Sequence, residues 1–168
     1  KKEKQELESH GFLRKDVGIE YFKNLIKDIN TQIYVAKDNN GNVIGFASIH
    51  KKKFDIINVR DVIGNLLFEN DEIKELLLNT NTEFAYLDQI SIMPEFKRRG
   101  IANAIFQKVL VDIDTPIVAF IVEEPIFNKA SIYWHDKNGF KFSGISVGEY
   151  KGIRFKFQIF INWNKKEK

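Results

Sequence analysis

Cysteine is absent from this chain of 168 residues. Disulfides, thiolate-bound metal sites and a cysteine nucleophile are therefore excluded. Histidine is scarce, because only His10, His50 and His135 occur, and these positions lie far apart in the sequence. A structural zinc site needs several ligands at characteristic spacing, so we expect no metal.

Long apolar runs are also missing. The longest uninterrupted one spans residues 117–122, whereas a membrane helix needs roughly 20 residues. No apolar segment follows the charged residues 1–4, so no signal peptide is expected. These features predict a cytoplasmic protein without a membrane partner.

The chain carries little excess charge of either sign. Lys and Arg number 26 against 23 Asp and Glu, a formal charge of +3, which is too mild to indicate a nucleic-acid-binding protein on its own. Hydrophobic residues make up 43% and charged residues 29%, the balance of a globular chain rather than a disordered one. With no repeat and no Pro- or Gly-rich linker, residues 1–168 are expected to form a single domain.

The first half of the chain predicts a helix followed by a hairpin. Apolar residues recur at helical spacing over about 17–30, which indicates an amphipathic helix. Strands are expected at 33–36 and 43–49. The Asn40-Gly41 pair between them supplies the positive φ angles that a tight hairpin turn needs.

The segment at about 53–82 is interpreted as a helical insertion. Short helices are expected at 62–68 and 73–78. Asn70 or Asp71 is the candidate N-cap of the second helix, because either side chain can accept the free N–H groups of a first helical turn.

The second half of the chain alternates strands with helices. A strand is expected over 84–92, with these residues on one face: Phe84, Tyr86, Asp88, Ile90 and Ile92. The next elements are a helix from 101 to 113, a central strand at 117–122, a helix at about 128–137 and a hairpin whose second arm alternates over 153–163. This order predicts a mixed α/β sheet with at least one right-handed strand–helix–strand crossover.

The most informative segment joins the strand at 84–92 to the helix that follows. The basic run 97–99 stands before Gly100 and Ala102, where small residues let a ligand approach the backbone closely. The first N–H groups of a helix lack internal partners and carry partial positive charge. The segment therefore suits an anion such as a pyrophosphate. A solvated basic turn and a nucleic-acid-binding patch are the alternatives.

Two motifs in this half resemble those of a known family. The first is a strand ending in Ile92-x-Pro94 followed by Lys97-x-x-Gly100-x-Ala102. The second is Asn128-x-x-Ser131-x-x-Trp134-His135-x-x-x-Gly139-Phe140. In this order, with a strand between them, they resemble the GCN5-related N-acetyltransferases (GNAT) over roughly 84–163. Lys97 stands where the family usually has Gln or Arg, and His135 stands where it usually has Tyr.

The resemblance implies a fold of the α/β class. The expected GNAT-like acyl-CoA N-acyltransferase fold has a central, twisted, mostly antiparallel sheet with flanking helices. The strands at 84–92 and 117–122 would form its splayed parallel pair. The family's first strand has no visible counterpart before the helix at 17–30. The insertion at 53–82 replaces what is normally a short hairpin, and we expect it to form a lid that sets substrate choice.

Acetyl-CoA is the cosubstrate that the resemblance implies, lying between the two splayed strands. Its pantetheine arm is expected to bond the exposed backbone of Ile90, Ser91 and Ile92. Asn128 and Ser131 are expected beside the same ligand. The residues expected to hold the pyrophosphate form the loop and the first helical turn: Lys97, Arg98, Arg99, Gly100, Ile101, Ala102 and Asn103.

The implied reaction is direct attack of a primary amine on the thioester in a ternary complex. A primary ammonium has a pKa near ~10.4, so it must first lose a proton, and a carboxylate acting directly or through a water is the usual base. The candidate acids are Glu123, Asp88 and Glu124, with a water-only mechanism as the alternative. The backbone N–H of Ile92 is the expected donor to the oxyanion.

His135 occupies the position of the family's Tyr, which donates a proton to the departing thiolate. A protonated histidine can do the same, and an inert replacement is the alternative. The acceptor is expected to be an amine, whether a small molecule, a peptide N-terminus or a lysine, with no nucleic-acid partner.

Two other interpretations stay open at this stage. One is a non-catalytic acyl-CoA-binding module of the same fold. The other is a nucleic-acid-interacting protein, for which binding should weaken steeply with salt. The long alternating strand at 153–163 also suggests pairing in a homodimer.

Overall fold

Seven strands and four α-helices make up the part of the chain that the computed structural model describes, residues 18–51, 65–79, 81–150 and 152–164. In chain order the elements are α2 (Ile19–Lys27), β1 (Thr31–Lys37), β2 (Val43–His50), β3 (Asn65–Phe68), α4 (Asp71–Leu78), β4 (Ala85–Ile92), the 3-10 turn η1 (Pro94–Phe96), α5 (Ile101–Asp112), β5 (Ile117–Glu124), α6 (Lys129–Lys137), β6 (Lys141–Tyr150) and β7 (Ile153–Asn162).

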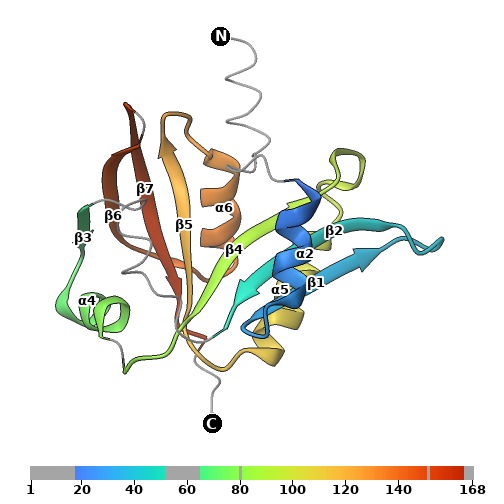
Figure 1. The fold of residues 1–168 in the computed structure, drawn as a ribbon, viewed down its shortest axis with the longest axis horizontal. Helices are drawn as coiled ribbons and strands as arrows, with labels where there is room; N and C mark the ends of the chain where they lie inside the picture. Colours follow the sequence, from blue (N-terminus) through green and yellow to red (C-terminus); the bar gives the residue numbers. More distant parts are fainter. Residues whose placement is uncertain (1–17, 52–64, 80, 151, 165–168) are drawn as a thin grey trace.

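The strands form one mixed sheet in the order β1-β2-β4-β5-β7-β6-β3. Neighbouring strands are antiparallel except β4 and β5, which are parallel. The β4–β5 ladder has only two pairs, Ala85 with Ile117 and Tyr86 with Val118. Beyond Tyr86 the two strands separate, as Figure 1 shows. The predicted mixed sheet with a splayed parallel pair is therefore confirmed.

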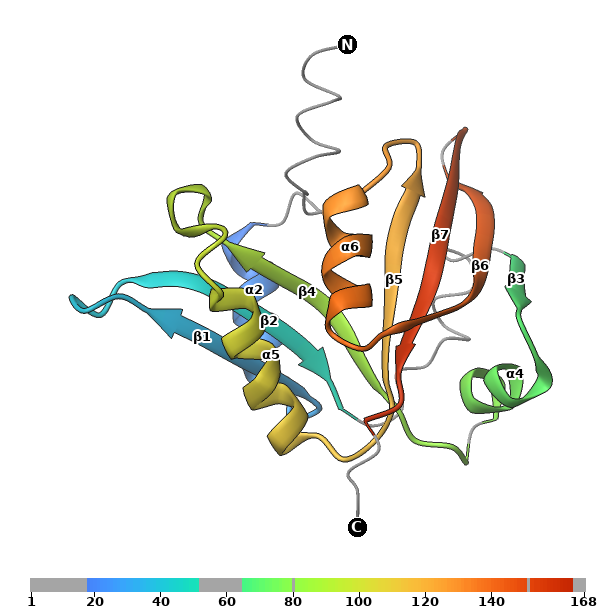
Figure 2. The ribbon, with the colours of Figure 1, turned by 180° about the vertical axis from the view of Figure 1, so that it is seen from behind.

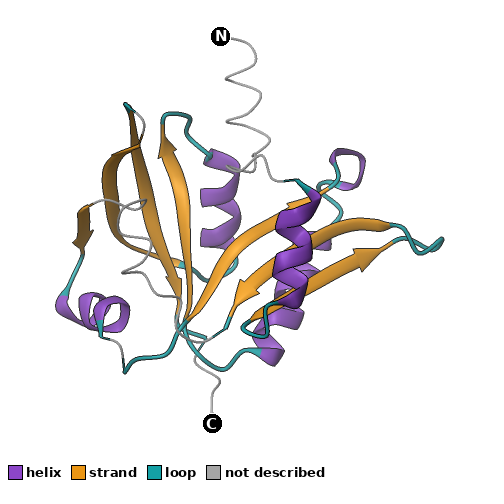
Figure 3. Cartoon of the chain, in the orientation of Figure 1, coloured by secondary structure: helices purple, strands orange, loops and turns teal. Residues whose placement is uncertain are grey.

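Helices cover both faces of this sheet. In Figure 1, α2 lies in front of β1, β2 and β4, and in Figure 2, seen from behind, α5 and α6 lie in front of the sheet. Figure 3 shows α4 beside the far edge of the sheet, next to β3. The splayed strands β4 and β5 therefore run between α2 on one face and the α5–α6 pair on the other.

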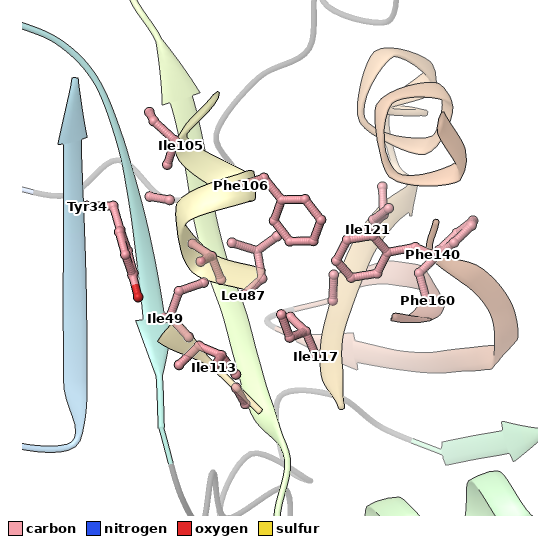
Figure 4. Close-up of a cluster of buried hydrophobic side chains, with 14 residues drawn as sticks. Tyr34, Ile49, Leu87, Ile105, Phe106, Ile113, Ile117, Ile121, Phe140 and Phe160 are labelled. Atoms are coloured by element: carbon pink, nitrogen blue, oxygen red, sulfur yellow. The ribbon is translucent and has the colours of Figure 1, made fainter. Parts of the chain in front are cut away.

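The main hydrophobic core lies beneath α5 and α6 (Figure 4). Phe106 of α5 and Phe140, which follows α6, are both fully buried, and their ring centroids are 5.2 Å apart. Leu87 of β4 and Ile121 of β5 belong to the same cluster. The aromatic pair thus packs across the separation between β4 and β5, where backbone pairing has ended.

A second core lies on the opposite face, beneath α4. Apolar residues at helical spacing bury one side of α4 against Val118 of β5 and Ile159 of β7: Ile73, Leu76 and Leu77. The predicted N-cap is confirmed, because the Asn70 side chain accepts a hydrogen bond from the Ile73 N–H at 3.0 Å.

A β-bulge interrupts β4 at Asp88. Ser48 of β2 pairs with Gln89, and the next β2 residue, Ile49, pairs with Leu87. Asp88 is therefore one extra residue on β4, which the register between β2 and β4 passes over. A bulge of this kind shifts the side-chain alternation by one residue and bends the strand.

The bulge corrects the predicted face of β4. Leu87 packs into the core beneath α5, and so do Ile90 and Ile92. The strand prediction was right, but Ile90 and Ile92 do not share the face of Phe84, which packs beneath α4. A period of two holds only while every residue has one partner, so a single extra residue sends all later side chains to the other face.

The prediction of a helix at 62–68 is wrong for its described part. Asn65–Phe68 forms strand β3, which pairs antiparallel with β6. A short apolar run cannot be assigned to helix or strand by periodicity alone, and here the edge of β6 decides. Residues 53–64 of the insertion, which include 62–64 of this predicted helix, lie outside the described residues. The part of the insertion that is described, β3 and α4, lies at the β6 edge of the sheet.

Strand β7 alternates as predicted. Its apolar face packs in the core beneath α4 and in a smaller core with Val122 of β5. It lies between β5 and β6, and from Lys156 to Ile161 both of its edges are paired. Along that stretch β7 therefore has no open edge that could pair with a second copy of the chain.

Candidate functional site

The loop between β4 and α5 turns the chain through two left-handed residues. Arg98 has φ 61° and Gly100 has φ 79°. A Cβ built on Gly100 would meet no atom within 4 Å, so the space before the helix is open and the backbone angle alone favours glycine. The Arg99 guanidinium lies over the Phe96 ring, 5.3 Å from its centroid. Arg98 and Arg99 are exposed, and Lys97 is half-buried.

The N-terminus of α5 is uncapped. Its N-cap residue is Gly100, which has no side chain to accept from the first N–H groups, and its first turn holds no acidic residue. The Gly100 carbonyl accepts its helical bond from Ala104, so the N–H groups of Ile101, Ala102 and Asn103 precede the first helical bond. Helix α4 differs, since Asn70 caps it and acidic residues occupy its first turn. Free donors, the positive end of the helix dipole and nearby arginines make the α5 end suitable for a pyrophosphate.

Beyond Tyr86, the edge of β4 that faces β5 has backbone donors with no ladder partner among the described residues. On the other edge, the Met93 N–H donates to the Ile44 carbonyl at 2.9 Å. Successive N–H groups of a strand point to opposite edges. The N–H groups of Ile90 and Ile92 therefore point into the separation between β4 and β5, and that of Ser91 points to β2.

Close packing against β2 holds this end of β4 in place. Gly45 pairs with Ile92, and a Cβ at Gly45 would lie 2.4 Å from Ile92 Cδ1 and 3.1 Å from the Ser91 carbonyl oxygen. No larger residue fits there without moving Ile92. Ile90 and Ile92 thus present their N–H groups along the separation, whereas Ser91, which was expected to do the same, is paired with Phe46 of β2.

Side chains clamp the start of α5 to α6. The Asn103 Oδ1 accepts hydrogen bonds from Trp134 Nε1 at 2.8 Å and from Asn138 Nδ2 at 3.3 Å. The Trp134 ring also packs edge-on against Phe106, with centroids 5.4 Å apart. The two sequence motifs therefore meet in space, through residues whose contacts the motifs alone did not reveal.

Asn128 and Ser131 build the start of α6. The Asn128 side chain accepts the Ser131 N–H at 3.2 Å, and its own N–H donates to the Val122 carbonyl at 3.1 Å. Asn128 is buried, and the Ser131 hydroxyl lies 3.3 Å from His135 Nδ1. Their expected contact with acetyl-CoA stays a prediction.

Glu123 is the extra residue of a second irregularity, between Val122 and Glu124 of β5. Its carboxylate accepts hydrogen bonds from Lys156 at 2.9 Å and from Gln158 at 3.0 Å, both on β7. Burial alone would raise the pKa of Glu123, but the bonds from Lys156 and Gln158 outweigh it and hold that pKa below its usual range. Glu124 pairs instead with Arg154 at 3.2 Å.

Asp88 lies on the α2 face of the sheet, at the point where β4 and β5 separate. Its side chain is 5% exposed and accepts a hydrogen bond of 2.5 Å from the Tyr21 hydroxyl of α2. Burial, together with this bond to Asp88, raises the pKa of Tyr21 well above its usual value. Gln89 Nε2 contacts the same hydroxyl at 3.3 Å. Tyr21 is a site residue that the sequence did not single out, because its position in an amphipathic helix does not distinguish it from a core aromatic.

His50 connects Asp88 to the surface. Its Nε2 lies 3.8 Å from Asp88 Oδ2, and its Nδ1 lies 2.9 Å from the Thr31 hydroxyl. Thr31 in turn donates to Asp28 Oδ2 at 2.7 Å. The His50 ring stacks on Tyr86 with centroids 5.9 Å apart and an interplanar angle of 15°. The histidine is therefore held from two sides in a chain of polar contacts from β4 to the start of β1.

His135 is buried among aromatic rings, including Phe140 and Phe160. Its Nδ1 lies 2.7 Å from the Ser131 carbonyl oxygen, so Nδ1 carries the proton and donates it there. Its Nε2 has no hydrogen-bond partner among the described residues. Burial lowers the pKa of His135 to about 4, against a smaller opposing effect of the Ser131 bond. The imidazole is thus neutral near pH 7, a placement that does not favour the proton-donor role.

Among the described residues, no three His, Asp or Glu side chains gather as metal ligands would. Within the same part of the chain, no helix combines the length and the apolarity needed to cross a bilayer.

The fold has many counterparts among solved structures. NAA60 from Arabidopsis thaliana, solved with a bisubstrate analogue, is 15% identical with a TM-score of 0.63, over 95% of this chain and 91% of that one. The ribosomal-protein-S18-alanine N-acetyltransferase from Escherichia coli is 14% identical with a TM-score of 0.61, over 97% and 85%. A chimera of the Vibrio cholerae spermidine N-acetyltransferase SpeG is 17% identical with a TM-score of 0.55, over 86% and 74%. At these identities the likeness concerns the fold.

Sequence comparison identifies the family. A search of curated proteins finds no significant match. A family model described as the acetyltransferase (GNAT) family matches residues 3–140, which is more than half of the chain and ends on the last residue of the second motif. The splayed β4–β5 pair and the uncapped α5 agree with that match. The chain therefore belongs to the acetyltransferase (GNAT) family, and acetyl transfer is the activity that this membership supports.

Proposed function

We propose that the protein transfers the acetyl group of acetyl-CoA to a primary amine by direct attack in a ternary complex. The observation that carries the proposal is the separation of β4 from β5 after two pairs, with the uncapped N-terminus of α5 at its open end. Unpaired backbone donors along one side and an anion-binding helix end suit a ligand that is extended and anionic at one end.

The direction of the ligand follows from this arrangement. The anionic end belongs at α5, so the acyl end points back along β4 toward the closed end of the separation. From Ile92 to Asp88 a strand of four steps covers about 13 Å. The thioester would then lie near Asp88, and the Ile90 N–H, two residues closer to that end than the Ile92 N–H, is the better placed donor to the oxyanion.

In the reaction, the amine nitrogen forms a bond to the carbonyl carbon and the carbon–sulfur bond breaks. A primary ammonium that reacts with acetyl-CoA gives an acetamide, the free thiol and one proton. The protein must therefore bind two substrates together, stabilise the negative oxygen of the tetrahedral species and carry one proton away. The backbone N–H groups of β4 serve the second task, and a carboxylate serves the third.

The first test is thermal unfolding with saturating acetyl-CoA, with desulfo-CoA and ATP as comparison ligands. A ligand at about 100 times its Kd stabilises by roughly 2.7 kcal/mol, or on the order of 5–10 °C for a domain of this size. An increase specific to CoA species, followed by release of free thiol with a panel of amines, supports the proposal. No increase at millimolar acetyl-CoA contradicts it.

A matched pair of variants locates the binding site. Arg99→Glu reverses a charge beside the α5 N-terminus, and Lys74→Glu makes the same change in charge on α4, at the far edge of the sheet. Arg99→Glu should weaken acetyl-CoA binding and Lys74→Glu should not. Equal effects would mean that net charge, not the α5 site, governs binding.

A non-catalytic acyl-CoA-binding module is the second candidate, favoured by one observation. His135 replaces the family's usual Tyr, and its only N–H is directed to the Ser131 carbonyl. A member without a proton donor for the thiolate could bind acyl-CoA without efficient turnover. Thermal stabilisation by acetyl-CoA with no thiol release across the amine panel would favour this module.

A further inference from the structure

The polar side chains beneath α2 converge on Asp88 from three elements. Tyr21 comes from α2, His50 from the end of β2, and Gln89 is the next residue of β4. The bulge is what makes this possible, because consecutive residues Asp88 and Gln89 both contact the Tyr21 hydroxyl, at 2.5 and 3.3 Å. In an unbulged strand, neighbouring side chains point to opposite faces.

The same place holds polar atoms that have no partner. Ser48 and Gln89 are paired across β2 and β4, and both are more than nine-tenths buried. Neither the Ser48 hydroxyl nor the Gln89 Oε1 has a hydrogen-bond partner among the described residues. Buried polar atoms are nearly always satisfied. One is on the residue that follows Asp88 and the other on that residue's partner in β2. Together they indicate a place that receives a hydrogen-bond donor, and an ammonium group carries three donors.

We infer that Asp88 takes the proton from the acceptor ammonium and that His50 passes it to solvent, while Tyr21 positions the carboxylate. This inference rests on the proposed function. Asp88 lies at the closed end of the β4–β5 separation, where the thioester would be, and on the face that carries α2. The amine would therefore approach from the α2 face, opposite α5 and α6.

The proton would leave the site through Asp88 and then His50. The ammonium N–H bond breaks and the proton joins Asp88, whose Oδ2 lies 3.8 Å from His50 Nε2. His50 then holds a proton on each nitrogen, with Nδ1–H directed to the Thr31 hydroxyl, 2.9 Å away. The His50 side chain is 22% exposed, so the imidazolium can release its proton to water. The amine is left neutral and nucleophilic.

Among the described residues, the groups that face this pair come from α2, β1, β2 and β4. Asp88 is faced by Tyr21, His50 and Gln89, and His50 is faced by Asp88, Thr31 and the Tyr86 ring. Asp28 lies one contact further, behind Thr31.

The rival base, Glu123, is occupied by other partners. Lys156 and Gln158 both donate to its carboxylate, and Lys156 forms an ion pair with it at 2.9 Å. A carboxylate stabilised in this way is a weak proton acceptor. Its side chain contacts β7 residues rather than α2, so it lies apart from the cluster around Tyr21.

The test is the pH profile of kcat/KM for wild type, Asp88→Asn and His50→Gln with an alkyl amine. Asp88→Asn should lower kcat by about 100-fold or more, which is the usual contribution of a general base. His50→Gln should lower kcat about 10-fold and displace the acidic limb of the profile, and added imidazole should restore part of the rate. The KM for acetyl-CoA should change less than twofold in both variants.

The choice of amine provides a control that distinguishes a general base from a residue with only a structural role. An amine whose conjugate acid has a pKa below the assay pH arrives already neutral and needs no base to become a nucleophile, and the proton that its nitrogen loses after attack goes to the departing thiolate. The deficit of Asp88→Asn should therefore shrink by at least tenfold with such an amine. Asp114→Asn, the same substitution on an exposed loop, should leave every rate unchanged.

Each outcome separates this inference from the proposed function. Turnover by wild type with unaltered rates and profiles in Asp88→Asn and His50→Gln overturns the inference and leaves the function standing. Loss of activity in Glu123→Gln alone assigns the base to Glu123 and also overturns it. If wild type releases no thiol with any amine, the function fails first. If Asp88→Asn misfolds and is no longer stabilised by acetyl-CoA, the His50→Gln variant tests the inference instead. The inference then stands if the acidic limb of its pH profile is displaced and imidazole restores part of its rate, and it fails if neither occurs.

Discussion

The substitution Asn103→Asp separates two roles of the start of α5, its contribution to stability and its proposed binding of the pyrophosphate. The Asn103 Oδ1 accepts hydrogen bonds from Trp134 and Asn138, and a carboxylate of the same shape can accept both. It would also place a negative charge in the first turn of a helix that has none. A charge there stabilises a helix by about 0.3–1 kcal/mol, or on the order of 1–4 °C for a chain of this size. The unliganded protein should therefore unfold at a higher temperature.

Acetyl-CoA binding should change in the opposite direction. A pyrophosphate on the first-turn N–H groups would lie roughly 7 Å from the new carboxylate. At the dielectric constant of water, the two pyrophosphate charges and the carboxylate repel each other by about 1 kcal/mol. At half the dielectric constant of water, the repulsion is about 2 kcal/mol. The Kd should rise about 5- to 30-fold, and the loss should shrink as added salt screens the charges.

The assay is thermal unfolding without ligand, together with calorimetric titration of acetyl-CoA at two salt concentrations. Gln107→Glu is the matched control, because it makes the same amide-to-acid change about 6 Å further along the axis of α5. It should leave affinity nearly unchanged. If Asn103→Asp destabilises the unliganded protein, or binds acetyl-CoA as tightly as wild type, the α5 N-terminus is not the pyrophosphate site argued for here.

Three other predictions concern stability. His135 has a pKa of about 4 in the folded protein and 6.5 in the unfolded chain, so between these pH values the unfolded state alone binds the proton. The free energy of unfolding should therefore fall by up to about 3 kcal/mol as the pH drops from 6.5 to 4. Urea titrations should show that slope, and His135→Leu should flatten it. Asn70→Ala removes the cap of α4 and should lower stability by about 1 kcal/mol without altering acetyl-CoA affinity; an affinity change would show that α4 contributes to the site. Phe106→Ala removes a fully buried ring and should lower stability by about 3–5 kcal/mol in denaturant titrations, and a loss under 1 kcal/mol would refute the packing described.

Long periodic segments and short motifs were predictable from the sequence. The helix at 101–113, the central strand at 117–122 and the hairpin turn at Asn40-Gly41 follow from local patterns, and the structure has all three. The two motifs also predicted the order of elements around the splayed strands. These features depend on residues that are close together in the chain, so spacing alone describes them.

The features that the sequence did not predict depend on distant neighbours. The bulge at Asp88 is visible only in the register between β2 and β4. The hydrogen bonds that Lys156 and Gln158 donate to Glu123 depend on how β5 pairs with β7. The assignment of 62–68 to a helix failed because the edge of β6 offered a partner to Asn65–Phe68. In each case a tertiary contact decided between local alternatives that were nearly equal.

The short β4–β5 ladder has a mechanical consequence. Among the described residues, strand pairing between the half-sheet β1-β2-β4 and the half-sheet β5-β7-β6-β3 consists of two residue pairs. The other links across the junction are side chains, chiefly the Phe106–Phe140 stack and the Asn103–Trp134 hydrogen bond. The sheet thus consists of two plates that share hydrophobic cores but have little backbone pairing between them. Fewer hydrogen bonds at such a junction favour local opening there. A ligand bonded along the separation would tie the plates together, so amide exchange should slow in both at once and the plates should unfold as one cooperative unit.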